Sequence, residues 1–219
     1  DIPNMSLNIH FVTVGHAKGE AISKGPVIET FQNYQNISRL YLLCSHEKAI
    51  REISNELKLF RRLEVVGIEI DPFDFTDIIG KIIEIHGKER KIEPKANFYV
   101  NVTGGTKVMS CAALVGANYI GAIAYYVRED DETSIELTPP KIPPQDLTAI
   151  QRKIVKAADK RPLTQTQIHN TLNISIQKVN YNCKSLERYG YLSIMAHESD
   201  GRATLIRLTP LGKVALRAF

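Results

Sequence analysis

Segments with the composition of β-strands alternate with segments of helical periodicity through residues 7–138. The strand-like segments are rich in β-branched and aromatic residues, and the helix-like segments space isoleucine and leucine three or four positions apart. Such alternation is typical of a parallel sheet covered by helices, and it predicts an α/β, Rossmann-like doubly wound sheet. The expected strands are residues 7–15, 39–45, 63–70, 97–103 and 122–128, with an antiparallel edge strand at 134–139, and the expected helices include residues 48–60 and 75–88.

A proline-rich segment divides the chain. Residues 139–146 contain four prolines within six positions, and proline continues neither a helix nor a central strand. The sequence therefore predicts a first domain at residues 5–138, a semi-rigid linker at residues 139–146 and a second domain at residues 147–219. Met5 is the expected native start, with residues 1–4 an addition ahead of it.

The second domain has the pattern of a winged helix-turn-helix. Thr164, three residues ahead of Gln167, is expected to cap its second helix, and Gly190 is expected to end its third. An SDGR turn then separates two strand-like runs, which predicts a hairpin. The expected elements are helices at residues 147–159, 163–173 and 174–190, the hairpin at residues 191–208, and a last helix at residues 209–219.

Charge is divided unevenly between the two domains. Residues 1–145 hold 16 Lys and Arg against 19 Asp and Glu, whereas residues 146–219 hold 12 against 5. A basic domain is a candidate for binding a polyanion, and the winged-helix pattern makes double-stranded DNA the expected partner.

The third helix of the second domain is the expected DNA reader. Its apolar residues Ile176, Val179, Cys183 and Leu186 are spaced to face the core. The opposite face carries amides that can pair with base edges, together with cations and a phenol that can reach phosphates or bases. Arg202, at the hairpin tip, is placed to enter a minor groove. The predicted DNA-binding residues are Gln177, Lys178, Asn180, Tyr181, Lys184 and Arg202.

Neither membrane insertion nor secretion is expected. No apolar run reaches the length of about 18 residues that a membrane helix needs, and the N-terminal segment lacks the pattern of a signal peptide, so a cytoplasmic location is expected. The three cysteines, Cys44, Cys111 and Cys183, lie far apart in apolar segments. They are therefore expected to be reduced core residues rather than metal ligands. No metal and no cofactor are predicted.

The stretch NVTGGTK, residues 101–107, is the clearest functional feature of the first domain. A predicted strand ends at Thr103, two glycines allow a sharp turn, and Thr106 and Lys107 open a helix whose free amides favour an anion. The spacing is neither that of a P-loop nor GxGxxG, so the sequence indicates neither ATP hydrolysis nor dinucleotide binding. The loop after the first strand is expected to lie beside this stretch, because both follow the carboxyl ends of strands.

The first-strand loop, the N-x-TGGTK-x-M motif with its small-residue helix, and the following YYV strand together resemble the CARF domain, the CRISPR-associated Rossmann fold. The second domain resembles the winged helices of MarR-like and ArsR-like regulators, so the chain looks like a CARF–HTH transcriptional regulator. The resemblance implies a role in antiviral defence as a homodimer that binds a cyclic oligoadenylate, most often cyclic tetra-adenylate, across its two-fold axis. It implies a ligand site formed by Gly15, His16, Asn101, Thr103, Gly104, Gly105, Thr106 and Lys107.

Two alternatives remain open. Some CARF domains cleave the ring that they bind, so the second hypothesis is a metal-independent ring nuclease in which His16, Thr106 and Lys107 stabilise the developing charge. The third is a winged-helix regulator that senses another nucleotide or responds to dimerisation alone. The linker is not followed by the RxxxxH motif of HEPN nucleases, so an RNase effector domain is not expected.

Overall fold

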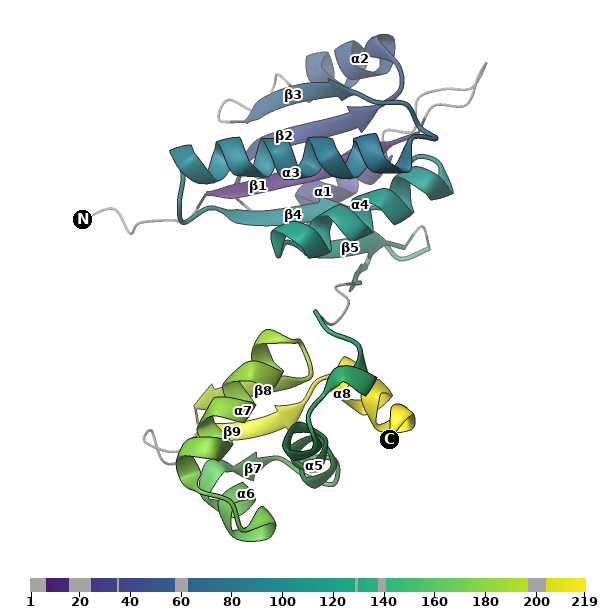
Figure 1. Cartoon of the computed structure of the whole chain (residues 1–219). Helices are drawn as coiled ribbons and strands as arrows, with labels where there is room; N and C mark the ends of the chain where they lie inside the picture. Colours follow the sequence, from purple (N-terminus) through teal and green to yellow (C-terminus); the bar gives the residue numbers. More distant parts are fainter. Residues whose placement is uncertain are drawn as a thin grey trace, which may run out of the picture. The chain divides into compact units, whose positions relative to one another are not determined.

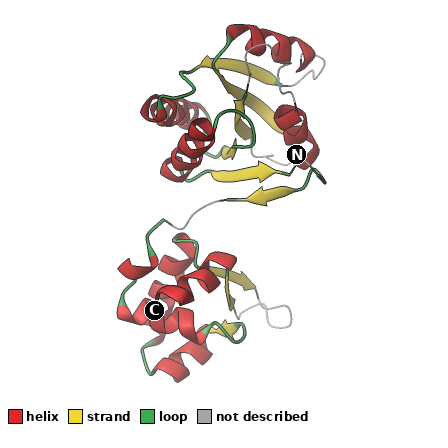
Figure 2. Cartoon of the chain, turned by 90° about the vertical axis from the view of Figure 1, so that its right-hand side faces the viewer, coloured by secondary structure: helices red, strands yellow, loops and turns green. Residues whose placement is uncertain are grey.

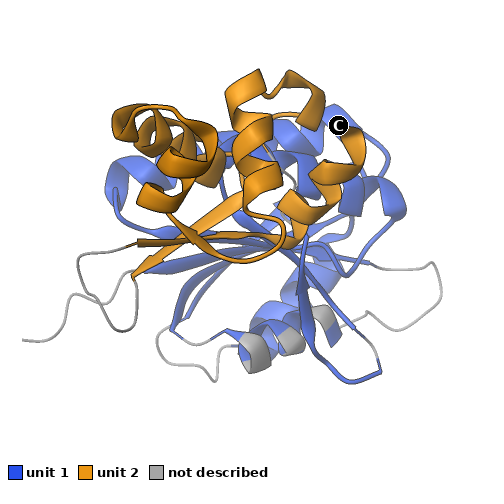
Figure 3. Cartoon of the chain, turned by 90° about the horizontal axis from the view of Figure 1, so that it is seen from below, with its two compact units in different colours: residues 1–138 blue, residues 139–219 orange. Residues whose placement is uncertain are grey.

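The computed structural model describes residues 7–15, 25–34, 36–57, 63–128, 130–137, 141–196 and 204–219. The chain divides into two compact units, residues 1–138 and residues 139–219, which Figure 3 colours separately. The division falls at the start of the proline-rich segment. Within the described residues, no helix is both long and apolar enough to cross a membrane.

A mainly parallel six-stranded sheet forms the centre of the first unit (Figure 1 and Figure 2). The strand order is β3-β2-β1-β4-β5-β6, and among these described strands all neighbours pair in parallel except β5 and β6. The expected α/β class and the antiparallel sixth strand are confirmed, while assignment to the Rossmann-like folds stays a prediction. The strands are β1 (Asn8–Val14), β2 (Ile37–Cys44), β3 (Glu64–Glu69), β4 (Asn97–Asn101), β5 (Ile123–Val127) and β6 (Ser134–Glu136), and the helices are α1 (Gly25–Asn33), α2 (Glu47–Leu57), α3 (Phe75–Ile92) and α4 (Lys107–Ile120).

Helices cover both faces of this sheet. Side chains alternate along β1, so that Ile9 and Phe11 pack in the core under α3 and α4, whereas Val12 and Val14 pack in the core under α1 and α2. Figure 1 shows α3 and α4 together on the face toward the viewer. All four of these side chains are at most 1% exposed. Burial on both faces explains why the central strands are nearly continuous hydrophobic runs.

The register of β1 and β4 positions the candidate ligand loop. The two strands lie side by side and parallel, with Val12 paired to Asn101. The carboxyl ends of parallel neighbours meet at one edge of a sheet. The segment that follows β1 and the loop of residues 102–106 therefore start next to each other.

The described residues of the second unit form a winged helix with a three-stranded antiparallel sheet of order β7-β9-β8. Thr164 caps α6 as expected, because its hydroxyl accepts a hydrogen bond from Gln167 N at 3.2 Å. Gly190 follows α7 with a φ of 90°, a left-handed conformation that ends the helix without a Cβ clash. The elements are α5 (Ala149–Ala157), β7 (Leu163–Thr164), α6 (Gln165–Leu172), α7 (Ile176–Arg188), β8 (Leu192–Ala196), β9 (Thr204–Leu208) and α8 (Pro210–Ala215), with short 3-10 turns at Pro144–Asp146 and Leu216–Ala218.

Three sequence-based expectations are corrected. Leu163 and Thr164 form β7 rather than the start of a helix. Pairing with β9 determines their conformation, because a segment of two residues is too short to show a periodic pattern. Ile176 is 37% exposed, since it is the first residue of α7 and lies beyond the turns that pack on the core. Cys111 is exposed because the buried face of α4 lies on the other residues of the helix, while Cys44 and Cys183 are buried as expected.

Candidate functional site

Gly15 and Gly105 bring two predicted loops into contact. A Cβ atom placed on Gly15 would lie 2.9 Å from the backbone nitrogen of Gly105, so the two backbones touch. Gly105 has a φ of 86°, and a Cβ there would lie 2.8 Å from the sulfur of Met109. Glycine is therefore needed at both positions, at one for the close approach and at the other for the left-handed turn.

The N-terminus of α4 has the features of an anion site. Thr106 caps the helix by accepting a hydrogen bond from Met109 N at 3.1 Å, and it donates to the carbonyl of Pro72 at 2.8 Å. The amides of Lys107 and Val108, in the first turn, have no acceptor within the helix. The Lys107 side chain is exposed and makes no hydrogen bond or ion pair with another described residue. Two amides and one ammonium group are thus available to an anion.

Two predicted ligand residues, Asn101 and Thr103, form a hydrogen-bonded network at the end of β4. Asn101 is fully buried, and its Nδ2 donates to Thr30 Oγ1 at 3.0 Å. Its Oδ1 accepts from Thr103 N at 2.9 Å and from the Thr103 hydroxyl. The hydroxyl oxygen of Thr103 in turn accepts from Val127 N at 2.9 Å. The Asn101 side chain thus shapes the start of the loop, and the Gly104 backbone beside it is also buried. Contact of Asn101 or Thr103 with a ligand stays a prediction.

The predicted ligand residue His16 and the predicted DNA-binding residue Arg202 lie outside the described residues. The ring-nuclease hypothesis includes His16 among its charge-stabilising residues, so that hypothesis stays a prediction. Among the described residues, no group of three or more His, Cys, Asp or Glu side chains is arranged to hold a metal ion.

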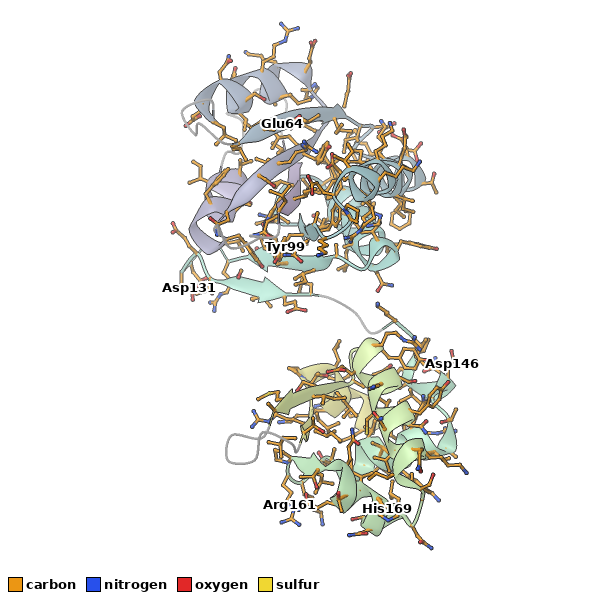
Figure 4. All side chains as sticks on the ribbon, turned by 90° about the vertical axis from the view of Figure 1, so that its left-hand side faces the viewer. Glu64, Tyr99, Asp131, Asp146, Arg161 and His169 are labelled. Atoms are coloured by element: carbon orange, nitrogen blue, oxygen red, sulfur yellow. The ribbon has the colours of Figure 1, made fainter. Side chains whose placement is uncertain are left out.

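A buried histidine of β1 was missed by sequence reasoning. The His10 ring is fully buried, stacks on Tyr99 (labelled in Figure 4) with ring centroids 4.6 Å apart, and places Nδ1 3.2 Å from the hydroxyl of Tyr125. Burial lowers the pKa of His10 from 6.5 to about 3. The ring is therefore neutral at neutral pH and supplies no charge to an anion. The only sequence signal was a histidine at a core-facing position of β1.

Five of the six predicted DNA-binding residues lie on the outer face of α7. Ser175 caps the helix, and Val179, Cys183 and Leu186 are fully buried beneath it. Tyr181 is 72% exposed, and Asn180 is half-buried with an Oδ1 atom that has no hydrogen-bond partner among the described residues. The remaining members of this face, all exposed, are Gln177, Lys178 and Lys184.

Ion pairing differs between the described parts of the two units. In the first unit, described cations form ion pairs at several places, such as Lys88 with Glu84 at 2.6 Å. In residues 141–196 and 204–219, by contrast, no Lys or Arg forms an ion pair with a described residue. The positive charge of these described residues is therefore available to an external polyanion.

Comparison with known families gives one match for each unit. The family described as HFX_2341-like, N-terminal, matches residues 8–132, and the family described as a winged helix DNA-binding domain matches residues 147–212. A protein of Methanocaldococcus jannaschii, the uncharacterized protein MJ1513, is 24% identical over 139 residues. The match covers 58% of this chain and 39% of that protein, so the chain spans well under half of its length.

Solved structures of regulators are similar to about a third of the chain. The adhesin competence repressor AdcR of Streptococcus pyogenes is 32% identical, with 34% of this chain and 55% of its own covered and a TM-score of 0.33. A variant of MarR from E. coli complexed with operator DNA is 21% identical, with 34% and 54% covered and a TM-score of 0.33. At such TM-scores, the winged-helix assignment rests on the family match and on the topology described above.

Proposed function

Since the chain belongs to the HFX_2341-like, N-terminal family and carries a winged-helix domain after that region, we propose that it is a DNA-binding transcriptional regulator whose first unit senses an anionic nucleotide. In its finer form, the proposal is a CARF–HTH regulator that acts as a homodimer and responds to a cyclic oligoadenylate. The DNA-binding part and the ligand-binding part are supported by different residues, and each has its own test.

The observation that carries the DNA-binding part is the unpaired charge on the outer face of α7. Lys178 and Lys184 are exposed and form no ion pair with a described residue, and Tyr181 stands beside them. Lysine supplies phosphate contacts, whereas the amides of Gln177 and Asn180 can pair with base edges in a major groove. This combination supports α7 as the helix that reads DNA.

We expect Lys178→Ala and Lys184→Ala each to weaken binding to a random-sequence DNA duplex. Each change removes about one phosphate contact, so the slope of log affinity against log salt concentration should become shallower by about one unit. Fluorescence anisotropy over a salt series measures both quantities. Gln177→Ala and Asn180→Ala should instead alter base preference, measured by selecting duplexes from a random pool.

The control for the lysine variants is Lys88→Ala in α3, because Lys88 is an exposed lysine paired with Glu84 in the first unit. It should leave both the affinity and the salt slope unchanged. If the two α7 lysine variants behave like Lys88→Ala, α7 is not the DNA-contacting helix.

The ligand-binding part is supported by the loop at the start of α4. Gly15 and Gly105 let two backbone segments meet there, and Lys107 adds a positive charge with no partner among the described residues. A phosphate fits this set of donors, since helix amides and an ammonium group both favour a negative charge. The resemblance of the N-x-TGGTK-x-M motif to CARF domains is what makes a cyclic oligoadenylate, most often cyclic tetra-adenylate, the proposed phosphate ligand.

Lys107→Ala is expected to weaken cyclic oligoadenylate binding by about 1.5–3 kcal/mol, roughly a 10- to 150-fold rise in Kd, because a charged hydrogen bond to phosphate is lost. Isothermal titration with cyclic tri-, tetra- and hexa-adenylate measures this and identifies the preferred ring. Circular dichroism checks that the variant is folded, and Lys88→Ala again serves as the matched lysine control. A folded Lys107→Ala protein with the wild-type Kd would remove Lys107 from the site.

A further inference from the structure

A chain of buried hydrogen bonds connects α1 with the end of β4. Thr30 of α1 is fully buried, and its Oγ1 accepts hydrogen bonds from Asn101 Nδ2 at 3.0 Å and from the Tyr125 hydroxyl at 3.3 Å. Asn101 and Tyr125 are also fully buried. One threonine oxygen of α1 thus joins two strands of the sheet.

The same asparagine also holds the start of the TGGTK loop. Asn101 Oδ1 accepts from the backbone amide of Thr103 at 2.9 Å and from its hydroxyl, and Val127 N donates to that hydroxyl oxygen at 2.9 Å. The main-chain carbonyl of Asn101 accepts from Thr13 Oγ1 of β1 at 3.3 Å. A single side chain therefore contacts α1 through its nitrogen and the loop through its oxygen.

The hydrogen bonds from Asn101 to Thr103 matter because the two residues after Thr103 are glycines. Gly104 and Gly105 have no side chains with which to restrict their own backbone, and glycine has the widest range of accessible conformations. The amide group of Asn101 is planar, so a shift of its nitrogen toward or away from Thr30 also moves its oxygen. The conformation of Thr103, directly before the glycines, is thus tied to the position of α1.

We propose that Thr30 and Asn101 are positioning residues that set the conformation of the Gly104–Thr106 loop from helix α1. A displacement of α1 changes the loop through the Thr30–Asn101–Thr103 hydrogen bonds. An effect on ligand affinity rests on the ligand site proposed above, whereas the mechanical link between α1 and the loop does not depend on any ligand.

The first test measures amide hydrogen exchange in the full chain without ligand. Thr30→Val keeps the shape of the side chain but removes the oxygen that accepts from Asn101. We expect exchange of the Val102 and Thr103 amides, which donate to the Tyr125 carbonyl and to Asn101 Oδ1, to accelerate about tenfold or more. Exchange in β2, on the far side of β1, should change much less.

Two matched variants separate positioning from general core packing. Thr30→Ser keeps the acceptor oxygen and should retain the slow exchange of the Val102 and Thr103 amides. Tyr125→Phe removes another donor to Thr30 and the contact of the Tyr125 hydroxyl with Asn101, but it leaves the Asn101–Thr30 bond in place, so it should accelerate loop exchange less than Thr30→Val does. The proposal is wrong if Thr30→Val leaves loop exchange unchanged, or if all three variants accelerate loop and β2 exchange to the same extent.

A second arm uses cyclic tetra-adenylate as the probe in isothermal titration. Thr30→Val should raise Kd although Lys107 is intact, and Thr30→Ser should restore the wild-type value. A wild-type protein that fails to bind any of the three cyclic oligoadenylates would overturn the proposed ligand, while the exchange experiment would still decide whether Thr30 and Asn101 position the loop.

Discussion

Glu89→Ala is expected to lower the free energy of unfolding of the first unit by about 3–5 kcal/mol. Glu89 of α3 is 3% exposed, and its two carboxylate oxygens accept hydrogen bonds from Arg39 and from the Tyr41 hydroxyl of β2. Arg39 is also held by Glu64 of β3, labelled in Figure 4, at 2.7 Å. Removing the carboxylate leaves a partly buried guanidinium and a buried hydroxyl without their main acceptor.

The pKa of Tyr41 is raised, first by burial and then by its hydrogen bond to Glu89, so the phenol stays protonated and able to donate. The matched control is Glu84→Ala, on the same helix, where the carboxylate is exposed and pairs with Lys88 at 2.6 Å. An exposed pair of this kind contributes little to stability, because water and salt screen it. Both variants can be compared in the full chain by the urea dependence of hydrogen exchange in β2 and α3, which reports opening of the first unit. A cost for Glu89→Ala no larger than that for Glu84→Ala would contradict the assignment.

A loss of stability in acid is the second large effect, and it arises from His10. The pKa of His10 is about 3 in the folded protein, against 6.5 without burial, so the folded state binds fewer protons than the unfolded state below pH 6.5. The stabilising contribution of the neutral ring is therefore present above pH 6.5 and is lost progressively as the pH falls toward 3. By a pH of about 4, the loss should reach about 3 kcal/mol.

His10→Phe isolates this contribution, because phenylalanine can still stack on Tyr99 but cannot take up a proton. The variant loses the hydrogen bond to Tyr125, so it should be the less stable protein at neutral pH. As the pH falls, the difference in unfolding free energy should shrink and then change sign. Urea unfolding followed by circular dichroism at a series of pH values measures the difference. Burial also lowers the pKa of His86, but this histidine is present in both proteins and therefore affects them equally. A difference that is constant with pH would show that His10 is not the titrating group.

Local sequence signals determined the elements of this protein. The alternation of strand and helix patterns predicted the mainly parallel sheet and its antiparallel sixth strand, and Thr164 and Gly190 marked helix ends where the structure has them. These features depend on residues within a few positions of one another, since a cap or an amphipathic stripe is a short-range property. The glycines and lysine of the TGGTK stretch were identified as a turn before a helix for the same reason.

Tertiary packing decided which side chains face inward and which meet across the sheet. The period of α4 does not reveal that Cys111 lies on its exposed face, and nothing near Asn101 in the sequence shows that Thr30 accepts its hydrogen bond from 71 residues away. The His10 cluster likewise draws Tyr34, Tyr99 and Tyr125 from separate elements. β7 forms because β9 pairs with it, since its two residues are too few to show the alternating pattern of a strand. Contacts of this kind depend on strand order and register, which the pattern within any one segment does not contain.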